Sequence, residues 1–428
     1  MRIVSIVART IRWSIASLGA ARGRTERAAV VIEARTDRGV IGLGEAAPLP
    51  GMSPDTLGDA ERAMASLARR VPFELPDREA AFALAAAVSN LATASNLATA
   101  SPAFSPAATT TTANSPAARF AIETALLDAL ARDRRITVAA LLGSPSGGAS
   151  TGPHAGEVRS SPHVGEVRSS LRGGSRSLAS QRVPLAAVVD DPDGARHAFA
   201  AGIRCFKIKL AAGDDPGRVR AIAEAAPDAR LRIDANRSWP LAEVAARLAA
   251  LAHLPIDYVE EPCAEAHRLA GERLPCKIAL DESLATIPPD ELRAALRGPG
   301  LAALVLKPTL LGGLSAVLTL AELARRAGVA AIVSHGLEGP VGTAACAELA
   351  LALGGDHPAG LAPHPALTDW SIAVEQLADD HVHPAASPGL GFVDLDLAGV
   401  VSACRERVEH SATCDGAIDQ RVNGGVVR

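Results

Sequence analysis

The sequence is poor in aromatic residues and carries no excess of positive charge. Aromatic side chains make up 3% of the 428 residues, and 43 basic residues face 47 acidic ones, which leaves a net charge of −4. Proteins that bind nucleic acids rely on clustered basic residues, and single-strand binders add stacked aromatic rings. We therefore expect no nucleic-acid partner.

The sequence also lacks membrane-spanning segments and closely spaced cysteine pairs. No apolar run approaches the roughly 20 residues that span a bilayer, and the N-terminus lacks a signal-peptide pattern. None of the six cysteines forms a C-x-x-C pair, so we expect reduced, mostly buried thiols and no zinc or redox chemistry. The sequence thus predicts a cytoplasmic protein without a membrane partner.

Three stretches have a biased composition. Residues 86–118 are mostly Ala, Ser and Thr and contain a tandem SNLATA, whereas residues 145–182 contain PHAGEVRSS followed by PHVGEVRSS. Residues 402–428 are polar and lack a helical period. Such compositions bury too little apolar surface to offset the entropy lost on ordering. We interpret the first two stretches as insertions in loops and the third as a disordered tail.

The remaining sequence predicts two structural units. We expect residues 1–140 to form the first, an α+β unit. Its strands are predicted by two β-rich runs at residues 28–35 and 40–45, which flank a short turn. A helical stretch near residues 55–70 follows them. Residues 120–131 have the period of an amphipathic helix.

From residue 183 onward, short apolar runs alternate with helical stretches rich in Ala, Leu, Arg and Glu. This alternation predicts parallel βα units, and no G-x-G-x-x-G motif or phosphate-binding loop follows any run. Eight regular units favour a closed α/β barrel over a doubly wound open sheet. We place the barrel at residues 183–370 and expect residues 371–401 to return to the first unit. The eight runs occupy residues 184–189, 205–210, 231–235, 257–261, 277–282, 303–308, 330–335 and 360–363.

Carboxylates lie at the ends of three successive runs, at Asp234, Glu260 and Asp281. The carboxyl ends of the strands form the active-site face of a βα barrel, and unpaired buried charges there are costly. Three carboxylates without His or Cys suit a hard cation such as Mg²⁺ or Mn²⁺. The alternative is that each carboxylate caps a helix or forms a surface salt bridge.

Two lysines, Lys207 and Lys209, lie two residues apart on one predicted strand and therefore face the same side. Their mutual repulsion and partial burial would lower the pKa of both, which produces an amine able to take a proton. The alternative is a surface strand with alternating lysines. Lys307, on a strand across the barrel, supports the functional interpretation.

These residues form an ordered set of motifs. K-I-K is followed by D-A-N at Asp234, E-E-P at Glu260, D-E-S at Asp281 and K-P-T at Lys307. In this order and spacing they resemble the enolase superfamily. The segment G-E-A-A-P-L-P-G at residues 44–51, together with K-P-T-L-L-G-G and S-H-G-L-E-G-P-V-G, is similar to its o-succinylbenzoate synthase branch.

The resemblance implies a (β/α)7β TIM-like barrel with an α+β capping domain. It also implies Mg²⁺ held by Asp234, Glu260 and Asp281, where the first Glu of E-E-P is the ligand. The implied reaction is the dehydration of 2-succinyl-6-hydroxycyclohexa-2,4-diene-1-carboxylate to 2-succinylbenzoate in menaquinone synthesis. The partner is then a small-molecule substrate, and the oligomeric state is left open.

The resemblance further assigns roles to single residues. Lys209 would remove the α-proton and later protonate the departing hydroxyl, whereas Lys307 would stay cationic and stabilise the enediolate that Mg²⁺ also stabilises. Lys207 would tune Lys209 and contact the substrate, and Asn236 would support the metal ligands.

Other positions of the branch face the substrate. These are Ser334, Gly336 and Glu338, and residues 44–53 would form part of a lid. The same scaffold supports N-succinylamino acid racemases and other racemases or cycloisomerases, which we keep as the alternative function. Residues 360–370 lack the D-x-D pair of dipeptide epimerases, which argues against that activity.

Overall fold

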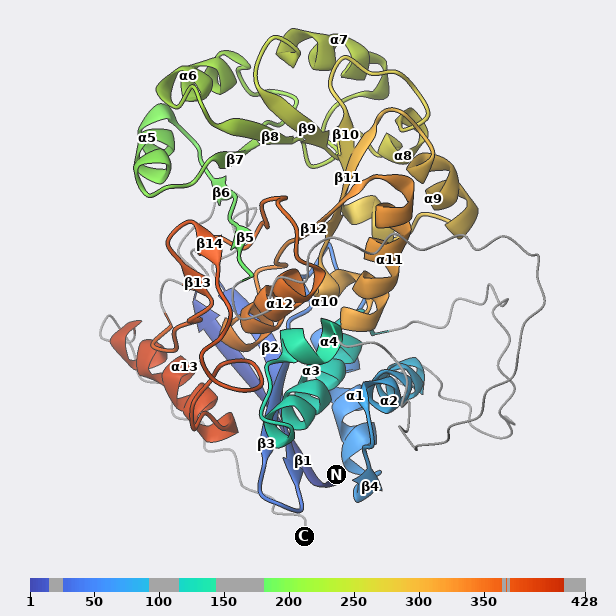
Figure 1. Ribbon diagram of the computed structural model, residues 1–428, viewed down its shortest axis with the longest axis vertical. Helices are drawn as coiled ribbons and strands as arrows, with labels where there is room; N and C mark the ends of the chain where they lie inside the picture. Colours follow the sequence, from blue (N-terminus) through green and yellow to red (C-terminus); the bar gives the residue numbers. More distant parts are fainter. Residues whose placement is uncertain (15–25, 92–114, 144–180, 364–366, 368–369, 412–428) are drawn as a thin grey trace, which may run out of the picture.

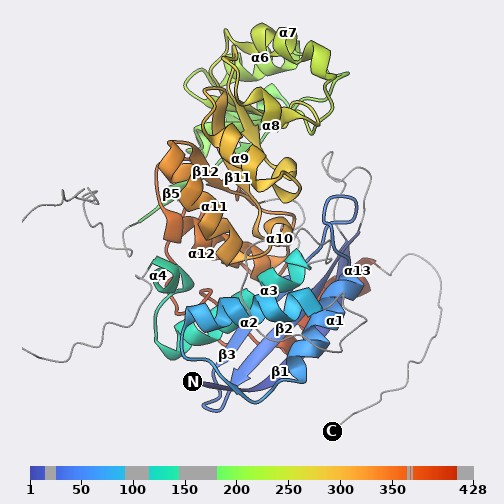
Figure 2. The same cartoon turned by 90° about the vertical axis from the view of Figure 1, so that its right-hand side faces the viewer.

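A computed structural model describes residues 1–14, 26–91, 115–143, 181–363, 367 and 370–411. Two lobes are visible, a curled parallel sheet ringed by helices and an antiparallel sheet packed with helices (Figures 1 and 2). Most of the first biased stretch and nearly all of the second lie outside the described residues.

The antiparallel lobe is the capping domain. Its sheet has the strand order β3-β2-β1-β4, and β1 pairs with β2 along most of its length. The middle of β2 is buried at consecutive positions, which means that both faces of the sheet are covered. The elements are β1 (Arg2–Ser14), β2 (Glu26–Thr36), β3 (Ile41–Ala46), β4 (Phe73–Glu74), α1 (Leu57–Ala68), α2 (Arg78–Leu91), α3 (Pro116–Asp133), α4 (Val138–Gly143) and α13 (Leu397–Ser411).

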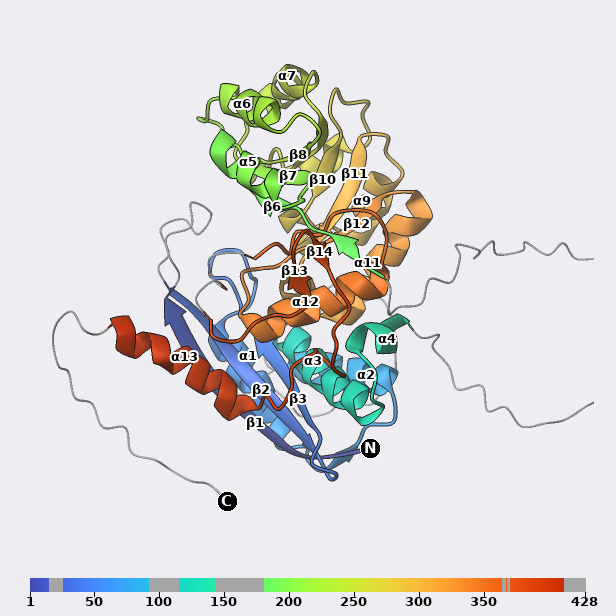
Figure 3. The same cartoon turned by 60° about the vertical axis from the view of Figure 1, so that its left-hand side comes forward.

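Helix α13 corrects the predicted tail. It packs against β1, as Figure 3 shows, and continues to Ser411. Ala403 and Cys404 are buried, and Cys404 Sγ donates a hydrogen bond to the Arg12 carbonyl oxygen at 3.1 Å. The backbone of residues 402–411 is helical, contrary to the predicted disorder, and at Ala403 and Cys404 the sheet supplies the apolar surface that the isolated segment lacks. Residues 412–428 lie outside the described residues.

Helix α3 corrects another expectation. A helix was predicted here and is present, but it is buried on nearly every side and is not amphipathic. It lies between strand β3 and the helices α2 and α10. Its two internal acidic residues are compensated from the same helix: Arg119 Nε lies 3.0 Å from a Glu123 oxygen, and Arg132 Nε lies 2.9 Å from an Asp128 oxygen.

Strand β3 approaches α3 so closely that only glycine fits at two positions. A Cβ atom on Gly44 would lie 2.0 Å from the Ala121 carbonyl oxygen, and one on Gly42 would lie 2.1 Å from the Ala125 oxygen. Both glycines face the same side of the strand, since they are two residues apart. Gly44 thus serves packing, although the resemblance placed it in the lid.

The barrel lobe contains a parallel sheet with the order β12-β11-β10-β9-β8-β7-β6. Each strand pairs with the next strand in the sequence, as the alternation of apolar and helical segments predicted. Its elements are β6 (Ala187–Val188), β7 (Cys205–Lys209), β8 (Arg230–Asp234), β9 (Ile256–Glu260), β10 (Ile278–Leu280), β11 (Leu301–Leu306), β12 (Ala330–Val333), α5 (Pro192–Ala200), α6 (Gly217–Ala225), α7 (Leu241–Leu251), α8 (Ala266–Leu269), η2 (Glu282–Ala285), α9 (Pro289–Leu296), α10 (Pro308–Leu311), α11 (Leu314–Ala327) and α12 (Pro340–Leu353).

The two edges of this sheet are joined by isolated bridges. Ala359 pairs with Leu185 and Gly360 pairs with Ser334, both in parallel. The predicted eighth strand is thus reduced to a short bridging segment. A small sheet of β5 (Val183–Pro184), β13 (Leu377–Ala378) and β14 (His381–Val382) lies beside it.

The cysteines that lie within the described ranges are buried, as expected: Cys205, Cys263, Cys276, Cys346 and Cys404. Cys414 lies outside them. None of the helices in the described part of the chain is long and apolar enough to cross a membrane.

The two lobes meet at the start of α12. The Glu45 carboxylate, at the end of β3, accepts hydrogen bonds from the backbone N–H groups of Gly339 and Gly342 at 2.6 and 2.9 Å. Burial raises the pKa of Glu45 to about 7, although these two bonds oppose the shift, and the nearby Glu338 carboxylate adds to it.

We predict that Gly44→Ala destabilises the protein by about 1–3 kcal/mol, because the added methyl group overpacks the contact with α3. The change would appear as a lower midpoint in chemical denaturation. Gly213→Ala is the matched control, since its Cβ atom meets nothing within 4 Å, and should stay within about 0.5 kcal/mol of wild type. Equal midpoints for the two variants would contradict the close packing.

We also predict that stability falls as the pH rises from 4.5 to 7. In this range the folded Glu45 keeps a proton that the unfolded chain has released, because its pKa is raised from 4.5 to about 7. The contribution amounts to at most about 3 kcal/mol. Glu45→Gln removes the titration and should flatten the slope of melting temperature against pH, with Glu272→Gln on the surface as the control. An unchanged slope in Glu45→Gln would refute the assignment.

Candidate active site

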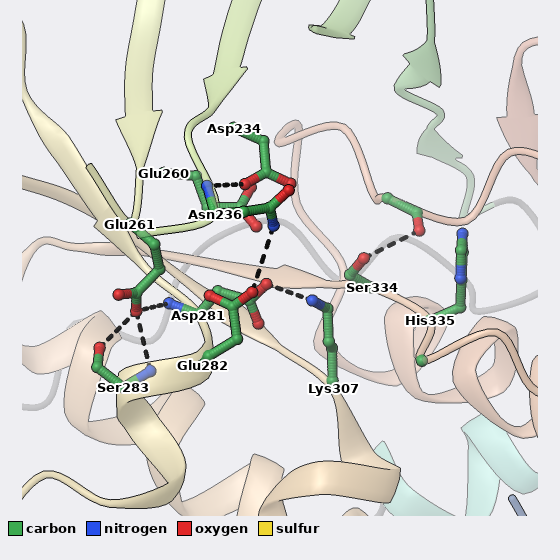
Figure 4. Close-up of polar contacts among 12 residues, drawn as sticks. Asp234, Asn236, Glu260, Glu261, Asp281, Glu282, Ser283, Lys307, Ser334 and His335 are labelled. Carbon is green, nitrogen blue, oxygen red and sulfur yellow. Dashed lines mark hydrogen bonds and ion pairs between the residues drawn. The ribbon is translucent and has the colours of Figure 1, made fainter. Parts of the chain in front are cut away.

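Charged side chains from five neighbouring strands gather at one end of the parallel sheet. Lys209, Asp234 and Glu260 are the last residues of β7, β8 and β9, and they are aligned in the strand register. Asp281 directly follows β10, and Lys307 directly follows β11. Figure 4 shows how the carboxylates and Lys307 point toward a common region. The structure therefore brings the predicted lysines and carboxylates to one end of the sheet.

Lys207 bridges two of the carboxylates. Its Nζ lies 2.8 and 2.9 Å from the two oxygens of Glu260 and 2.9 Å from Asp234 Oδ2. Burial alone would lower the pKa of Lys207, but Asp234 and Glu260 raise it well above its ordinary value. The expectation that both lysines have a lowered pKa was therefore wrong for Lys207, because carboxylates on the next two strands outweigh its lysine neighbour.

Lys209 behaves as expected. Burial lowers its pKa, and the positive charges of Lys207 and Lys307 add to this shift against the opposing effect of Asp234. Among the lysines of this group, Lys209 is thus the one whose pKa is lowered. A group that gives up its proton readily near neutral pH can act as a general base.

Lys307 pairs with the third carboxylate. Its Nζ contacts Asp281 Oδ2, and both side chains are almost fully buried. Burial opposes the charge on Lys307, but the Asp281 carboxylate raises its pKa, so this lysine stays cationic. Lys307 itself thus carries a positive charge at the end of β11, which Asp281 balances.

The surface alternatives can now be judged. Asp234, Glu260 and Asp281 are each less than 5% exposed, and each lies beside a lysine from a different strand. Asp281 stands at the N-cap of η2 but makes no side-chain capping bond. The carboxylates are therefore neither surface salt bridges nor ordinary helix caps, and the lysine strand is not a surface strand.

The donor set fits a hard divalent cation. Three carboxylates with oxygen donors alone are typical of Mg²⁺ sites, and the buried Glu282 Oε2 beside them has no hydrogen-bond partner among the described residues. Lysine ammonium groups neutralise the carboxylates here. Among the described residues, no three acidic, His or Cys side chains lie close enough together to hold a metal ion as they stand. A bound cation would share this charge balance with the lysines.

Asn236 lies next to this group. Its backbone N–H donates to Asp234 Oδ1 at 3.1 Å, and its side-chain amide donates to Glu282 Oε1 at 3.4 Å. These contacts connect the turns after β8 and β10. The role of Asn236 in supporting metal ligands stays a prediction.

The predicted substrate-facing residues lie on the turn after β12. Ser334 Oγ donates to the Gly360 carbonyl oxygen at 3.2 Å and so secures the bridged edge of the sheet. The Glu338 carboxylate is fully buried and accepts bonds from Thr309 Oγ1 at 2.5 Å and from the Gly336 N–H at 2.7 Å. The structure thus gives Ser334 and Glu338 contacts that shape this turn, and substrate binding by the three residues stays a prediction.

One residue that the sequence did not single out connects the lobes at this turn. Arg27 is buried and donates to the carbonyl oxygens of Ala47 at 2.8 Å and Pro48 at 3.0 Å in the capping domain. It also donates to the oxygens of Leu337 at 3.0 Å and Gly336 at 3.2 Å in the barrel. No sequence motif marks an arginine that binds backbone carbonyls, so only the structure reveals these contacts of Arg27.

A second missed residue is Glu261, the next residue after Glu260. Its carboxylate is fully buried and points toward Ser283, in the segment after β10 (Figure 4). The doubled Glu of E-E-P is visible in the sequence, but no motif indicates what the second Glu contacts.

Two family models match the chain. The model described as mandelate racemase / muconate lactonizing enzyme, N-terminal domain, matches residues 3–143, and the model described as enolase C-terminal domain-like matches residues 192–396. Together they cover both lobes.

Two of the curated relatives illustrate the similarity at the level of sequence. An o-succinylbenzoate synthase from Mycobacterium bovis is 38% identical over 193 residues, which are 42% of this chain and 57% of the relative. One from Yersinia pseudotuberculosis is 34% identical over 240 residues, which are 52% of this chain and 64% of the relative. These alignments span less than two thirds of the length of the relatives.

Solved structures share the fold. Muconate lactonizing enzyme from Pseudomonas putida is similar with a TM-score of 0.68 and 23% identity, over 94% of this chain and 99% of that one. A dipeptide epimerase from Methylococcus capsulatus, solved with Mg and a dipeptide, is similar with a TM-score of 0.66 and 22% identity, over 92% of this chain and all of that one. The two family models and the shared architecture show that this chain belongs to the enolase superfamily.

Proposed function

We propose that this protein is an o-succinylbenzoate synthase, which dehydrates 2-succinyl-6-hydroxycyclohexa-2,4-diene-1-carboxylate to 2-succinylbenzoate in menaquinone synthesis. The observation that carries the proposal is the contrast within the lysine group. Lys209 has a lowered pKa, whereas Lys207 and Lys307 stay cationic beside carboxylates. The name of the curated relatives supports the choice of substrate. The cytoplasmic location stays a prediction from the sequence.

Asp234, Glu260 and Asp281 would hold Mg²⁺ in this proposal, with Mn²⁺ as a substitute. The cation, when bound, supplies positive charge for the substrate carboxylate while the α-proton leaves. Residues 1–140 and 371–401, extended to Ser411 by α13, would form the capping domain over a barrel of residues 183–370.

The lysines would divide the proton transfers. Lys209 takes the α-proton as its amine and then, as its ammonium, gives a proton to the hydroxyl group that departs as water. Lys307 keeps its positive charge throughout and stabilises the negative charge that develops on the substrate. Lys207 holds Asp234 and Glu260 in place, and its positive charge adds to the effect of burial in lowering the pKa of Lys209.

N-succinylamino acid racemase is the second candidate, because removal and return of an α-proton need the same two-lysine arrangement. Lys209 and Lys307 lie at the ends of different strands of the curled sheet, which suits one base on each face of a substrate carbon. Dipeptide epimerases occur among the structural neighbours, but residues 360–370 lack the D-x-D pair of that activity.

We predict that wild type converts the cyclohexadiene substrate and that Lys209→Ala loses about 10²–10⁴-fold in kcat, which is the usual contribution of a general base. The measurement is the change in ultraviolet absorbance as the aromatic ring forms. Lys277→Ala is the matched control, since Lys277 is exposed just before β10, and should keep wild-type turnover. Retained turnover in Lys209→Ala would refute the proposed base. Exchange of the α-hydrogen of N-succinylamino acids for deuterium, without dehydration, would instead favour the racemase.

We also predict that a chelator abolishes the dehydration and that added Mg²⁺ restores it. Removal of the cation leaves the charge of the substrate carboxylate unbalanced in a site that is already rich in carboxylates. Asp281→Asn should raise the Mg²⁺ concentration needed for half-maximal rate. Turnover that persists in excess chelator would exclude the metal-dependent reaction.

A further inference from the structure

Glu261 lies among the strand ends that carry the three carboxylates, yet the proposed chemistry does not use it. Its side chain is fully buried. A buried carboxylate is costly unless several donors satisfy it. Four donors surround Glu261, and all of them come from turns that follow neighbouring strands.

Three of these donors lie after β10. Glu261 Oε1 accepts from the Asp281 N–H at 2.8 Å, the Ser283 N–H at 3.0 Å and Ser283 Oγ at 2.5 Å. The fourth lies after β8, where Arg237 Nε is 3.3 Å from Glu261 Oε2. The backbone adds two more contacts, because Arg237 N–H donates to the Glu261 carbonyl at 2.7 Å and Glu261 N–H donates to the Ala279 carbonyl at 3.0 Å.

The backbone conformation directs the two glutamates to different sides. Glu261 has a φ of +41°, which lies in the left-handed region that non-glycine residues rarely adopt. Glu260 reaches Lys207 whereas Glu261 reaches the turn after β10, since successive residues at a strand end face opposite sides. Such a conformation costs about 1–3 kcal/mol and persists only where the surroundings hold it. Here the hydrogen bonds from both neighbouring turns hold it.

We propose that Glu261 is a positioning residue that fixes the Asp281 backbone, and thereby aligns Asp281 with Asp234 and Glu260 for a divalent cation. This inference rests on the proposed function, because it takes these three carboxylates as metal ligands. Glu261 connects the turns after all three strands that carry them. Its own carboxylate points to the backbone and not to the cation.

The chain contains a matched control for this arrangement. Glu123 on α3 is also fully buried, and it accepts from the Ser315 N–H at 3.0 Å, from Ser315 Oγ at 2.5 Å and from Arg119 Nε at 3.0 Å. These are the same donor types that Glu261 has from Ser283 and Arg237. Glu123→Gln and Glu261→Gln therefore remove similar bonds, but only the second change lies beside the carboxylates.

The experiment is calorimetric titration of the full-length protein with MgCl₂, without substrate. We expect Glu261→Gln to bind Mg²⁺ at least about tenfold more weakly than wild type, the usual effect of losing a residue that orients a metal ligand. Glu123→Gln should bind as wild type does, even where its melting temperature falls equally. In the dehydration assay, saturating Mg²⁺ should restore most of the kcat of Glu261→Gln, since the lysines are untouched.

Equal Mg²⁺ affinity in wild type and Glu261→Gln would overturn the inference and leave the proposed function intact. Absence of Mg²⁺ binding in wild type would overturn both. Ser283→Ala, compared with Ser315→Ala, provides a milder pair that removes one donor each. Weaker Mg²⁺ binding in Ser283→Ala alone would support the inference even if Glu261→Gln does not fold.

Discussion

The balance of buried charge at the carboxyl ends of β7–β11 is the constraint on which the site depends. Lys207 is shared by Asp234 and Glu260, and Lys307 is held by Asp281. Removing one member of a buried ion pair typically costs about 3–5 kcal/mol, because the other charge is left uncompensated. Five strands must therefore deliver their charges together, and at the strand ends Lys209 pairs with Asp234 and Asp234 with Glu260, although the β8–β9 register shifts between Leu231 and Arg232.

Much of this arrangement could be predicted from the sequence. The alternation of short apolar runs with helical stretches fixes parallel βα units, and the carboxyl ends of parallel strands share one edge. The positions of Lys209, Asp234 and Glu260 at the ends of their runs were therefore enough to place them together. The β2–β3 hairpin of the capping domain was equally clear, because two β-rich runs flank a short turn.

Other features depend on contacts that no local pattern contains. The pKa of Lys207 rises because of two carboxylates on other strands, Asp234 and Glu260. The sequence of one strand does not show that these carboxylates lie beside the lysine. Strand β3, whose glycines allow a close approach, and helices of the barrel cover α3 on nearly every side. The sequence of α3 has the period of an amphipathic helix, and this period wrongly predicted an exposed face. The left-handed backbone conformation of Glu261 is held by the neighbouring turns.

The contact of α13 with β1 has a consequence for the order of folding during synthesis. The capping sheet begins with β1 at Arg2–Ser14, but the helix that packs on it is Leu397–Ser411, and Leu397 N–H donates to Glu33 Oε2 at 3.0 Å. All strands of the barrel lie between these two segments in the chain. Because domains generally fold as units while the chain emerges, the barrel can close on the ribosome before the capping sheet receives its last helix. The capping domain is thus completed only after every strand of the barrel has been synthesised, because α13 follows them in the chain.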